Sequence, residues 1–229
     1  MLHQILSGHF SFDTIIAELL AVLVIIFLVL PFHEWAHAFT ASCLGDKSIK
    51  QRGRLTFNPI NHIDIVGAAM MFLVGFGWAK PVPIDPRYFK KPKLGMAITA
   101  IMGPIANLAA ALAGRLIYNL LLFFFPEFMT YNFIGGILDT FFIFYISVNI
   151  SLAVFNLIPI PPLDGSKVLF LFLPDEAVNF CYRYQQVFFI ALFALIWSGA
   201  LSGVLGWATS GLYYGISWLA GLPFMPFIN

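Results

Sequence analysis

Long runs of hydrophobic residues, separated by short polar stretches, dominate this chain of 229 residues. The first run follows Asp13, has no charge over residues 19–32 and continues to Gly45. Asp13 suits an N-cap and Gly45 suits a C-terminal stop, so the pattern predicts one helix over residues 13–45. Such a helix is about 48 Å long at 1.5 Å per residue, which exceeds the thickness of a bilayer. Pro31 is expected to kink it.

The next part of the chain is expected to stay on one side of the membrane. Residues 46–64 are polar and rich in turn-forming residues, whereas residues 65–79 are apolar but contain three glycines. Fifteen residues are too few for a full span, and three glycines make a good helix unfavourable. Basic residues flank both ends. We therefore expect a re-entrant or β-hairpin-like membrane-associated segment within a cytoplasmic loop over residues 46–93. Two alternatives stay open for residues 65–79: a plain interfacial anchor, and an extended segment that pairs with a substrate strand.

The remaining apolar runs predict further membrane helices. Residues 94–125 and 133–158 form two long runs with one charged residue each. Residues 176–222 are expected to supply two accessory helices that divide near residue 200. The fold class is therefore an all-α polytopic membrane protein with about five transmembrane helices. We expect one domain over residues 1–229, with a core from about 13 to 173.

Composition supports this fold class. Hydrophobic residues make up 60% of the chain, charged residues make up 10%, and the mean hydropathy is +0.89. This leaves too little polar surface for a soluble globule and no room for a sizeable soluble domain. Nine of the twelve Lys and Arg residues lie between Lys47 and Lys93, which places that segment on the cytoplasmic side. A net charge of +1 gives no reason to expect nucleic-acid binding.

The most informative polar residues form the pentad His33-Glu34-Trp35-Ala36-His37 inside the first apolar run. Residues four apart lie on the same helix face, so both imidazoles can reach one metal ion. Glu34 can then act as general base toward a water molecule. Paired histidines are often ordinary core residues, but ionisable groups inside an apolar span are costly and indicate function. The longer zincin pattern has Gly at position 40 and a third His at position 43, but this chain has Thr and Cys there, so the third ligand must come from elsewhere.

The third ligand is expected from a segment that three prolines interrupt after the 133–158 run. This segment, residues 156–165, delivers Asp164 at the cytoplasmic end of its helix, on the same side as the two histidines. With a water molecule in the fourth position, three such ligands make an open catalytic zinc site. Two alternatives stay open: another residue on that side is the third ligand, or Asp164 is simply a solvent-exposed turn residue that binds no metal. The other candidates are His62, Asp64, Asp85, Asp175 and Glu176.

Together these motifs resemble the site-2 proteases, which are intramembrane zinc metalloproteases. The resemblance is carried by the pentad, by Asn-x-x-Pro-x-Pro-x-Leu-Asp-Gly over residues 156–165, and by Gly103-Pro104-x-x-Asn107. Residues 54–64 and 77–83 look like the compact prokaryotic branch without a PDZ or CBS domain. The resemblance implies a multi-pass protein of a prokaryotic plasma membrane.

The resemblance also implies roles for individual residues. It places one catalytic Zn²⁺ on His33, His37 and Asp164, with Glu34 as acid and base. Asn156 is implied to lie near the substrate or the transition state. From the spacing alone, Asn107 belongs to a small-residue helix face with Gly95, Thr99 and Gly103, which recur every four residues. A packing hydrogen bond from Asn107 to the first helix is favoured there over a catalytic role.

The expected function is hydrolysis of a peptide bond within or near a transmembrane segment of a membrane-protein substrate. The expected partners are that substrate and the lipid bilayer, and the oligomeric state is left open. The alternative from another class is a polytopic transporter or metal-ion carrier that uses the buried His and Asp residues. A non-catalytic relic of a protease fold is a second alternative, although it gives no reason for Glu34 to be present.

Overall fold

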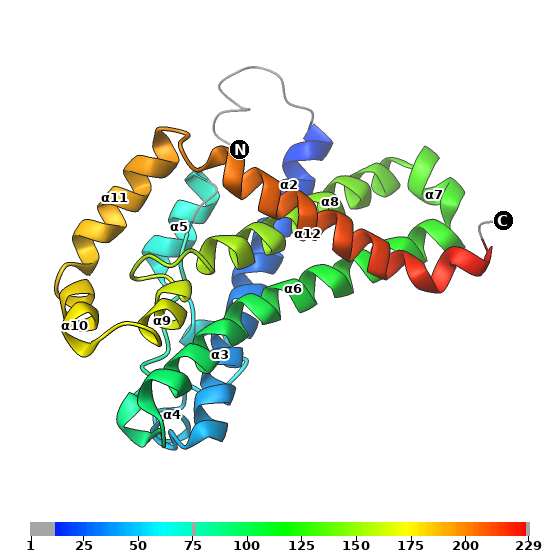
Figure 1. Cartoon of the computed structure of the whole chain (residues 1–229). Coiled ribbons are helices and arrows are strands. Elements are labelled where there is room, and N and C mark those ends of the chain that lie inside the picture. Colours follow the sequence, from blue (N-terminus) through cyan, green and yellow to red (C-terminus); the bar gives the residue numbers. More distant parts are fainter. Residues whose placement is uncertain (1–11, 75–76, 228–229) are drawn as a thin grey trace.

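The computed structural model describes residues 12–74 and 77–227. Within these ranges the chain folds as a set of helices and forms no strand, as Figure 1 shows. An isolated antiparallel bridge joins Ile63 to Ala79. The expected all-α architecture of an integral membrane protein is confirmed.

The first span is continuous but is not a uniform α-helix. It consists of α2 (Phe12–Val24), the π-helical turn η1 (Ile25–Val29) and α3 (Leu30–Leu44), and together they extend over 33 residues. Pro31 has no N–H for the helix ladder, and the widened π turn lies directly before it. The distortion expected at Pro31 therefore takes the form of a π turn one turn before the His-Glu-x-x-His pentad. Gly45 ends α3 with a φ of 124°, as expected, and Asp13 lies in the first described turn of α2.

The segment after α3 returns close to the point where it begins. Short helices α4 (Ser48–Gln51) and η2 (Pro59–Asn61) lead into α5 (Ile65–Val74), and η3 (Pro86–Tyr88) follows. The N–H of Lys80 donates to the carbonyl of His62 over 2.7 Å, beside the Ile63–Ala79 bridge. The two flanks of α5 therefore lie side by side, as a re-entrant segment requires, although residues 75–76 lie outside the described ranges.

The segment contains the helix α5 despite its glycines, whereas the sequence predicted that the glycines would make a good helix unfavourable. A Cβ atom on Gly67 would lie 2.1 Å from the carbonyl oxygen of Trp78, and one on Gly77 would lie 2.1 Å from the carbonyl oxygen of Gly67. Both glycines therefore allow α5 to pack directly against the extended chain that follows it. Their role is close backbone approach, which depends on tertiary contacts and not on local helix propensity.

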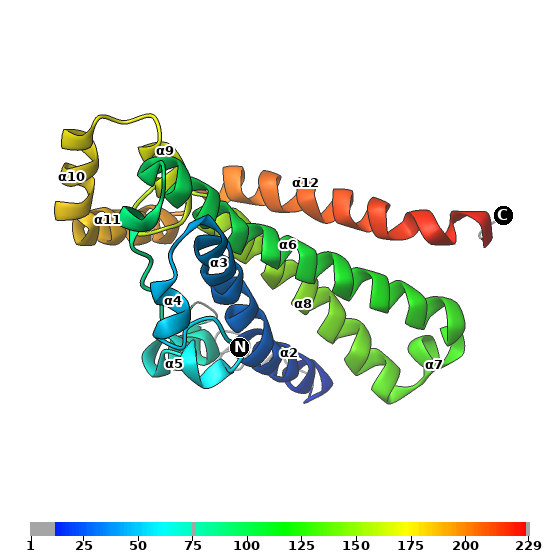
Figure 2. The same cartoon turned by 90° about the horizontal axis from the view of Figure 1, so that it is seen from below.

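Three long helices form the centre of the bundle. α6 (Pro92–Phe124) packs on α3 and on α8 (Phe133–Asn156), and Figure 2 shows α6 and α8 running side by side. The short helix α7 (Pro126–Tyr131) connects α6 to α8. Ile25 and Ile26 of the π turn pack with Ile146 and Ile150 of α8 in the main core. This packing holds the first span rigidly beside the helix that leads to the proline-rich segment.

The last helices are less regular than the sequence predicts. α9 (Gly165–Phe170) is followed by α10 (Asp175–Arg183) and α11 (Gln185–Trp197), which meet at an angle of 70° and stand beside the bundle in Figure 2. α12 (Ser202–Gly221) packs on α6 and α8 and continues into η4 (Leu222–Phe227).

The number of spans is smaller than expected. In the part of the chain that the structure describes, three helices are long and apolar enough to cross a membrane, or four if the bent pair α10–α11 is one span. The expected count of about five is not reached, because the Gly, Ser, Tyr and Trp residues of α12 dilute its hydropathy.

Candidate metal centre and active site

Helix α3 presents His33 and His37 toward one point inside the bundle. The two residues are separated by one helical turn, and both are buried. Their Nε2 atoms lie 3.0 Å apart, and the rings meet edge to face with centroids 4.7 Å apart. The π turn and Pro31 come directly before this face, so the histidines occupy the first regular turns after the distortion.

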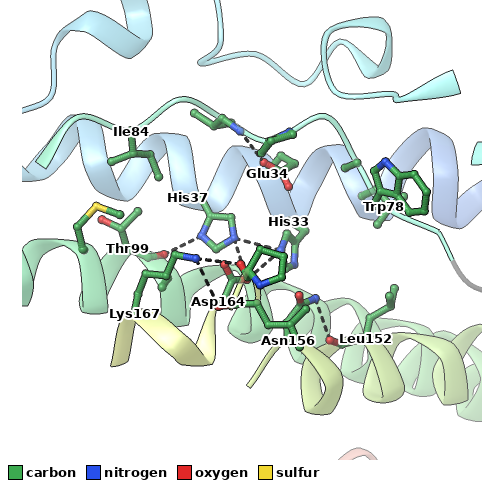
Figure 3. A pocket seen from close by; sticks show the side chains of 18 of the residues that line it. His33, Glu34, His37, Trp78, Ile84, Thr99, Leu152, Asn156, Asp164 and Lys167 are labelled. Carbon is green, nitrogen blue, oxygen red and sulfur yellow. Dashed lines mark hydrogen bonds and ion pairs between the residues drawn. The ribbon is translucent and has the colours of Figure 1, made fainter. Parts of the chain in front are cut away.

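The segment between α8 and α9 brings Asp164 to the same point. Its Oδ2 atom lies 3.4 Å from Nε2 of His33 and 3.2 Å from Nε2 of His37. The segment folds back on itself: a Cβ atom on Gly165 would lie 2.2 Å from the carbonyl oxygen of Leu157. The glycine after Asp164 therefore permits the turn that places the carboxylate, and Figure 3 shows the three side chains converging.

The three donor atoms fit a tetrahedral metal ion. Among the His, Cys, Asp and Glu side chains of the described residues, these three form a group whose ligand atoms all lie within 4.8 Å of one another. Ligands about 2.0–2.1 Å from a tetrahedral zinc ion lie roughly 3.3–3.4 Å from each other. The observed separations of 3.0, 3.2 and 3.4 Å are close to that value. Two imidazoles and one carboxylate are also a donor set that suits Zn²⁺ and leaves a position open.

A hydrogen bond sets the orientation of one of these rings. Nδ1 of His37 lies 2.8 Å from the backbone carbonyl oxygen of Thr99 on α6. Because a carbonyl oxygen only accepts, Nδ1 must carry a proton, which leaves Nε2 as the ring nitrogen that could bind a metal ion. This is the usual way in which a protein fixes the tautomer of a metal-binding histidine.

Gly103 of helix α6 packs directly against the rings of His33 and His37. A Cβ atom on Gly103 would lie 2.3 Å from Nε2 of His37 and 2.6 Å from Cε1 of His33. Gly103 belongs to the small-residue face that the sequence predicts, together with buried Thr99 and Asn107. That face packs on α3, so the absence of a side chain at position 103 creates the space that both imidazoles occupy.

Glu34 lines the same cavity from the neighbouring position on α3. The cavity has a volume of about 810 Å³ and also contacts Asn156, Tyr182 of α10 and Phe189 of α11. Oε2 of Glu34 accepts a hydrogen bond from the N–H of Val82 over 3.0 Å. Figure 3 shows Glu34 beside the extended chain between Trp78 and Ile84, with the histidines next to it.

The two asparagines singled out in the sequence have different surroundings. Asn156 lines the cavity, and one N–H of its side-chain amide donates to the carbonyl of Leu152 over 3.0 Å. The second N–H of this amide can donate to another acceptor. Asn107 is fully buried on α6, but neither of its amide atoms has a hydrogen-bond partner among the described residues. The packing hydrogen bond expected between Asn107 and the first helix is therefore not found.

The rival metal ligands have other partners. Nε2 of His62 lies 2.8 Å from the carbonyl oxygen of Thr56, and Asp64 accepts from the N–H of Gly67 at the start of α5. Hydrogen bonds from Arg87 lower the pKa of the Asp85 carboxyl to about 2. Asp175 pairs with Lys93 at 2.7 Å. None of these four residues is part of the cluster that the described chain forms, and neither is Glu176.

Other contributors to the site are less visible in the sequence. The carbonyl of Thr99 and the N–H of Val82 are backbone groups, which carry no residue-type signal. Lys167 donates to the carbonyl of Pro162 over 2.9 Å and so pins the turn before Asp164. The small-residue face was a signal for Gly103, although it did not show that histidines would fill the space.

Comparison with known proteins identifies the family. The chain is 41% identical over 174 residues to a Bacillus subtilis protein named "Putative zinc metalloprotease YwhC", and the match covers 74% of this chain and 78% of that relative. The chain belongs to peptidase family M50. The model of that family, "Peptidase family M50", matches residues 132–197, which include the proline-rich segment and Asp164.

More distant relatives of this M50 peptidase have similar names. It is 30% identical over 190 residues to "Putative zinc metalloprotease Rip2" of Mycobacterium tuberculosis, with 78% of this chain and 68% of the relative covered. The Rip2 protein of Mycolicibacterium smegmatis is 29% identical over 178 residues, with 76% of this chain and 65% of the relative covered. No solved structure matches the chain. The resemblance to site-2 proteases is thus confirmed, and the chain is a metalloprotease instead of a metal-ion carrier.

Proposed function

We propose that this M50 peptidase is an intramembrane zinc endopeptidase, which hydrolyses a peptide bond within or near a transmembrane segment of a membrane-protein substrate. The observation that carries the proposal is the convergence of His33, His37 and Asp164 at tetrahedral spacing, beside Glu34, inside a bundle of membrane helices. Residues 1–229 act as one domain, in which residues 13–173 hold the site and residues 176–222 are accessory.

The protein's own residues divide the chemistry between them. His33, His37 and Asp164 would hold one Zn²⁺, which when bound would supply Lewis acidity that polarises a carbonyl oxygen and makes water more acidic. Glu34 takes a proton from the attacking water as the water oxygen bonds to the scissile carbonyl carbon. It returns a proton to the leaving amine as the C–N bond breaks. The second N–H of Asn156 is available to the substrate backbone, or to the negative charge that develops on the carbonyl oxygen. Asn107 is not among the residues that line the cavity.

The position of the site constrains the substrate. A transmembrane helix hides its carbonyl groups in its own hydrogen bonds, so the scissile segment must unwind before it can be cut. Helix-breaking residues near the cleaved bond therefore favour cleavage. Nine of the twelve basic residues lie in the segment from Lys47 to Lys93, so we place this loop in the cytoplasm and the protein in a prokaryotic plasma membrane.

The test uses Glu34→Gln and a matched control, Glu127→Gln on the exposed helix α7. The purified proteins are assayed in detergent with single-span peptides that carry a Gly-Pro pair in their inner half and a fluorophore–quencher pair at their ends. Glu34→Gln should reduce cleavage about 10²–10⁴-fold and keep one zinc per chain, because it removes only the proton acceptor. Glu127→Gln should behave like the unaltered protein. Full cleavage by Glu34→Gln would show that Glu34 is not the general base.

A further inference from the structure

The hydrogen bond from Val82 to Glu34 follows from the local sequence Pro81-Val82-Pro83. Proline has no N–H, so the N–H of Val82 is the single backbone donor in these three residues. A proline also restricts the residue before it to extended conformations, and Val82 precedes Pro83. The chain therefore offers one donor, in an extended segment, at the place where Oε2 of Glu34 lies 3.0 Å away.

The side chain of Val82 anchors this donor from the other side. It is 7% exposed and belongs to the smaller of the two hydrophobic cores. The other buried members of that core are Ala38, Ala41, Ile49 and Phe89. Two of these, Ala38 and Ala41, lie on α3, the helix that carries Glu34. The distance between the Val82 backbone and α3 is thus set by packing as well as by the hydrogen bond.

Arg54 holds the chain directly before Val82. One guanidinium nitrogen donates to the carbonyls of Lys80 and Pro81 over 2.8 and 2.9 Å, and the other nitrogen donates to the carbonyl of Asn61. Asn61 precedes α5, whereas Lys80 and Pro81 follow it, so one side chain joins both flanks of the re-entrant segment. The rigid planar fork of arginine suits such multiple contacts, which a lysine cannot reproduce.

Asp46 holds the chain on the other side of Val82. This fully buried residue follows α3, and its Oδ2 atom accepts from the N–H of Asp85 over 2.9 Å. Its Oδ1 atom accepts from the N–H and the hydroxyl of Ser48 at 3.0 and 2.6 Å. Residues 80–85 are therefore fixed at both ends, with the Val82 donor between the two anchors.

We propose that Arg54 is a positioning residue for Glu34, which acts through the carbonyls of Lys80 and Pro81 and the N–H of Val82. The inference rests on the proposed role of Glu34 as general base. A glutamate side chain has three rotatable bonds, and a hydrogen bond to one carboxylate oxygen restricts them while the other oxygen can accept the proton of water. Loss of the Arg54 contacts lets residues 80–82 move, and Glu34 then loses the partner that orients it.

The experiment compares Arg54→Gln and Arg54→Lys with Arg52→Gln, a control with the same charge change at an exposed position two residues away. With the fluorogenic single-span peptides, Arg54→Gln should lower kcat about 10²-fold, because misplacement of a catalytic group by about 1 Å costs that much. KM and the content of one zinc per chain should not change. Arg54→Lys should retain part of kcat, and Arg52→Gln should match the unaltered protein.

A second readout does not depend on activity. Lys80, Val82 and Ile84 carry the exchangeable amides of residues 80–84, so hydrogen–deuterium exchange of a peptide over residues 78–86 reports on this segment. Exchange should rise in Arg54→Gln, where the segment is released. It should also rise in Glu34→Ala, where the acceptor for Val82 is removed.

The outcomes separate the inference from the proposed function. Full activity of Glu34→Gln would overturn the role of Glu34, whatever Arg54 does. If Glu34→Gln is inactive but Arg54→Gln keeps its kcat with raised exchange, the positioning role of Arg54 is wrong. A raised KM with unchanged kcat would likewise overturn it, because the segment would then bind substrate instead of orienting Glu34. If Arg54→Gln does not fold, the comparison uses Arg54→Lys, and an unchanged kcat in that variant would be the refuting result.

Discussion

Substitution of Gly103 by alanine tests the packing of α6 against the two histidines. The added Cβ atom would lie 2.3 Å from Nε2 of His37, 2.5 Å from its Cε1 and 2.6 Å from Cε1 of His33. Ordinary contact distances of about 3.5 Å require a displacement of roughly 1 Å. Metal–ligand distances in a functional site vary by only about 0.2 Å, so the imidazoles cannot move this far and keep the same ion.

We therefore expect Gly103→Ala to lose zinc and, with it, peptidase activity. The purified variant should contain much less than one zinc per chain by elemental analysis and should cleave the fluorogenic peptides at least about 10²-fold more slowly. Overpacking of this kind also destabilises a fold by about 1–3 kcal/mol, so the melting temperature should fall. Helix content from circular dichroism should not change, because alanine is the better helix former.

The matched control is Gly136→Ala in α8, where an added Cβ atom meets nothing within 4 Å. This variant should bind zinc and cleave normally, and the helix should gain up to about 1 kcal/mol from the better propensity of alanine. If Gly103→Ala binds one zinc with normal affinity and cleaves at the normal rate, the histidines are not confined by α6 and the described packing is wrong.

Two further predictions concern single carboxylates. Asp164→Asn should lose zinc, because the amide is a much weaker ligand, and its melting temperature should then be insensitive to a chelator that lowers that of the unaltered protein. An equal chelator effect on both proteins would contradict a ligand role for Asp164. Arg87 lowers the pKa of Asp85 from 3.8 to about 2, so this pair adds stability above pH 4 that is lost as the pH falls toward 2. Asp85→Asn should reduce the acid sensitivity of thermal melting in that range, and an unchanged pH profile would contradict the ion pair.

Several features of the fold were accessible from the sequence because they depend on residues near one another in the chain. The three long spans follow from apolar runs at Phe12–Leu44, Pro92–Phe124 and Phe133–Asn156, and their predicted boundaries differ from these by only a few residues. The shared direction of His33 and His37 follows from the four-residue helix repeat. The distortion near Pro31 follows from its missing N–H.

Other features depend on through-space neighbours and were predicted wrongly or not at all. The glycines of residues 65–79 indicated a poor helix, but Gly67 and Gly77 serve the contact between α5 and the chain after it. The hydrogen bond expected from Asn107 to the first helix is absent among the described residues, because a helix face does not specify its neighbour. α10 and α11 bend by 70° instead of forming one straight span, and no residue-type signal marks the bend.

The sequence by itself determined the membrane class of this protein and the histidine pair with its adjacent glutamate, and it predicted Asp164 as the partner of that pair. These properties follow from hydrophobicity, helical periodicity and the order of the spans. Only the tertiary structure decided that Asp164 lies 3.4 Å from His33 and 3.2 Å from His37, and that Gly103 leaves space for both rings. It also decided that Val82 donates to Glu34, and that Arg54 donates to the carbonyl of Lys80 in the same segment. Those contacts join residues up to about 130 positions apart, and several depend on backbone groups or on the missing side chain of a glycine, which residue types alone do not specify.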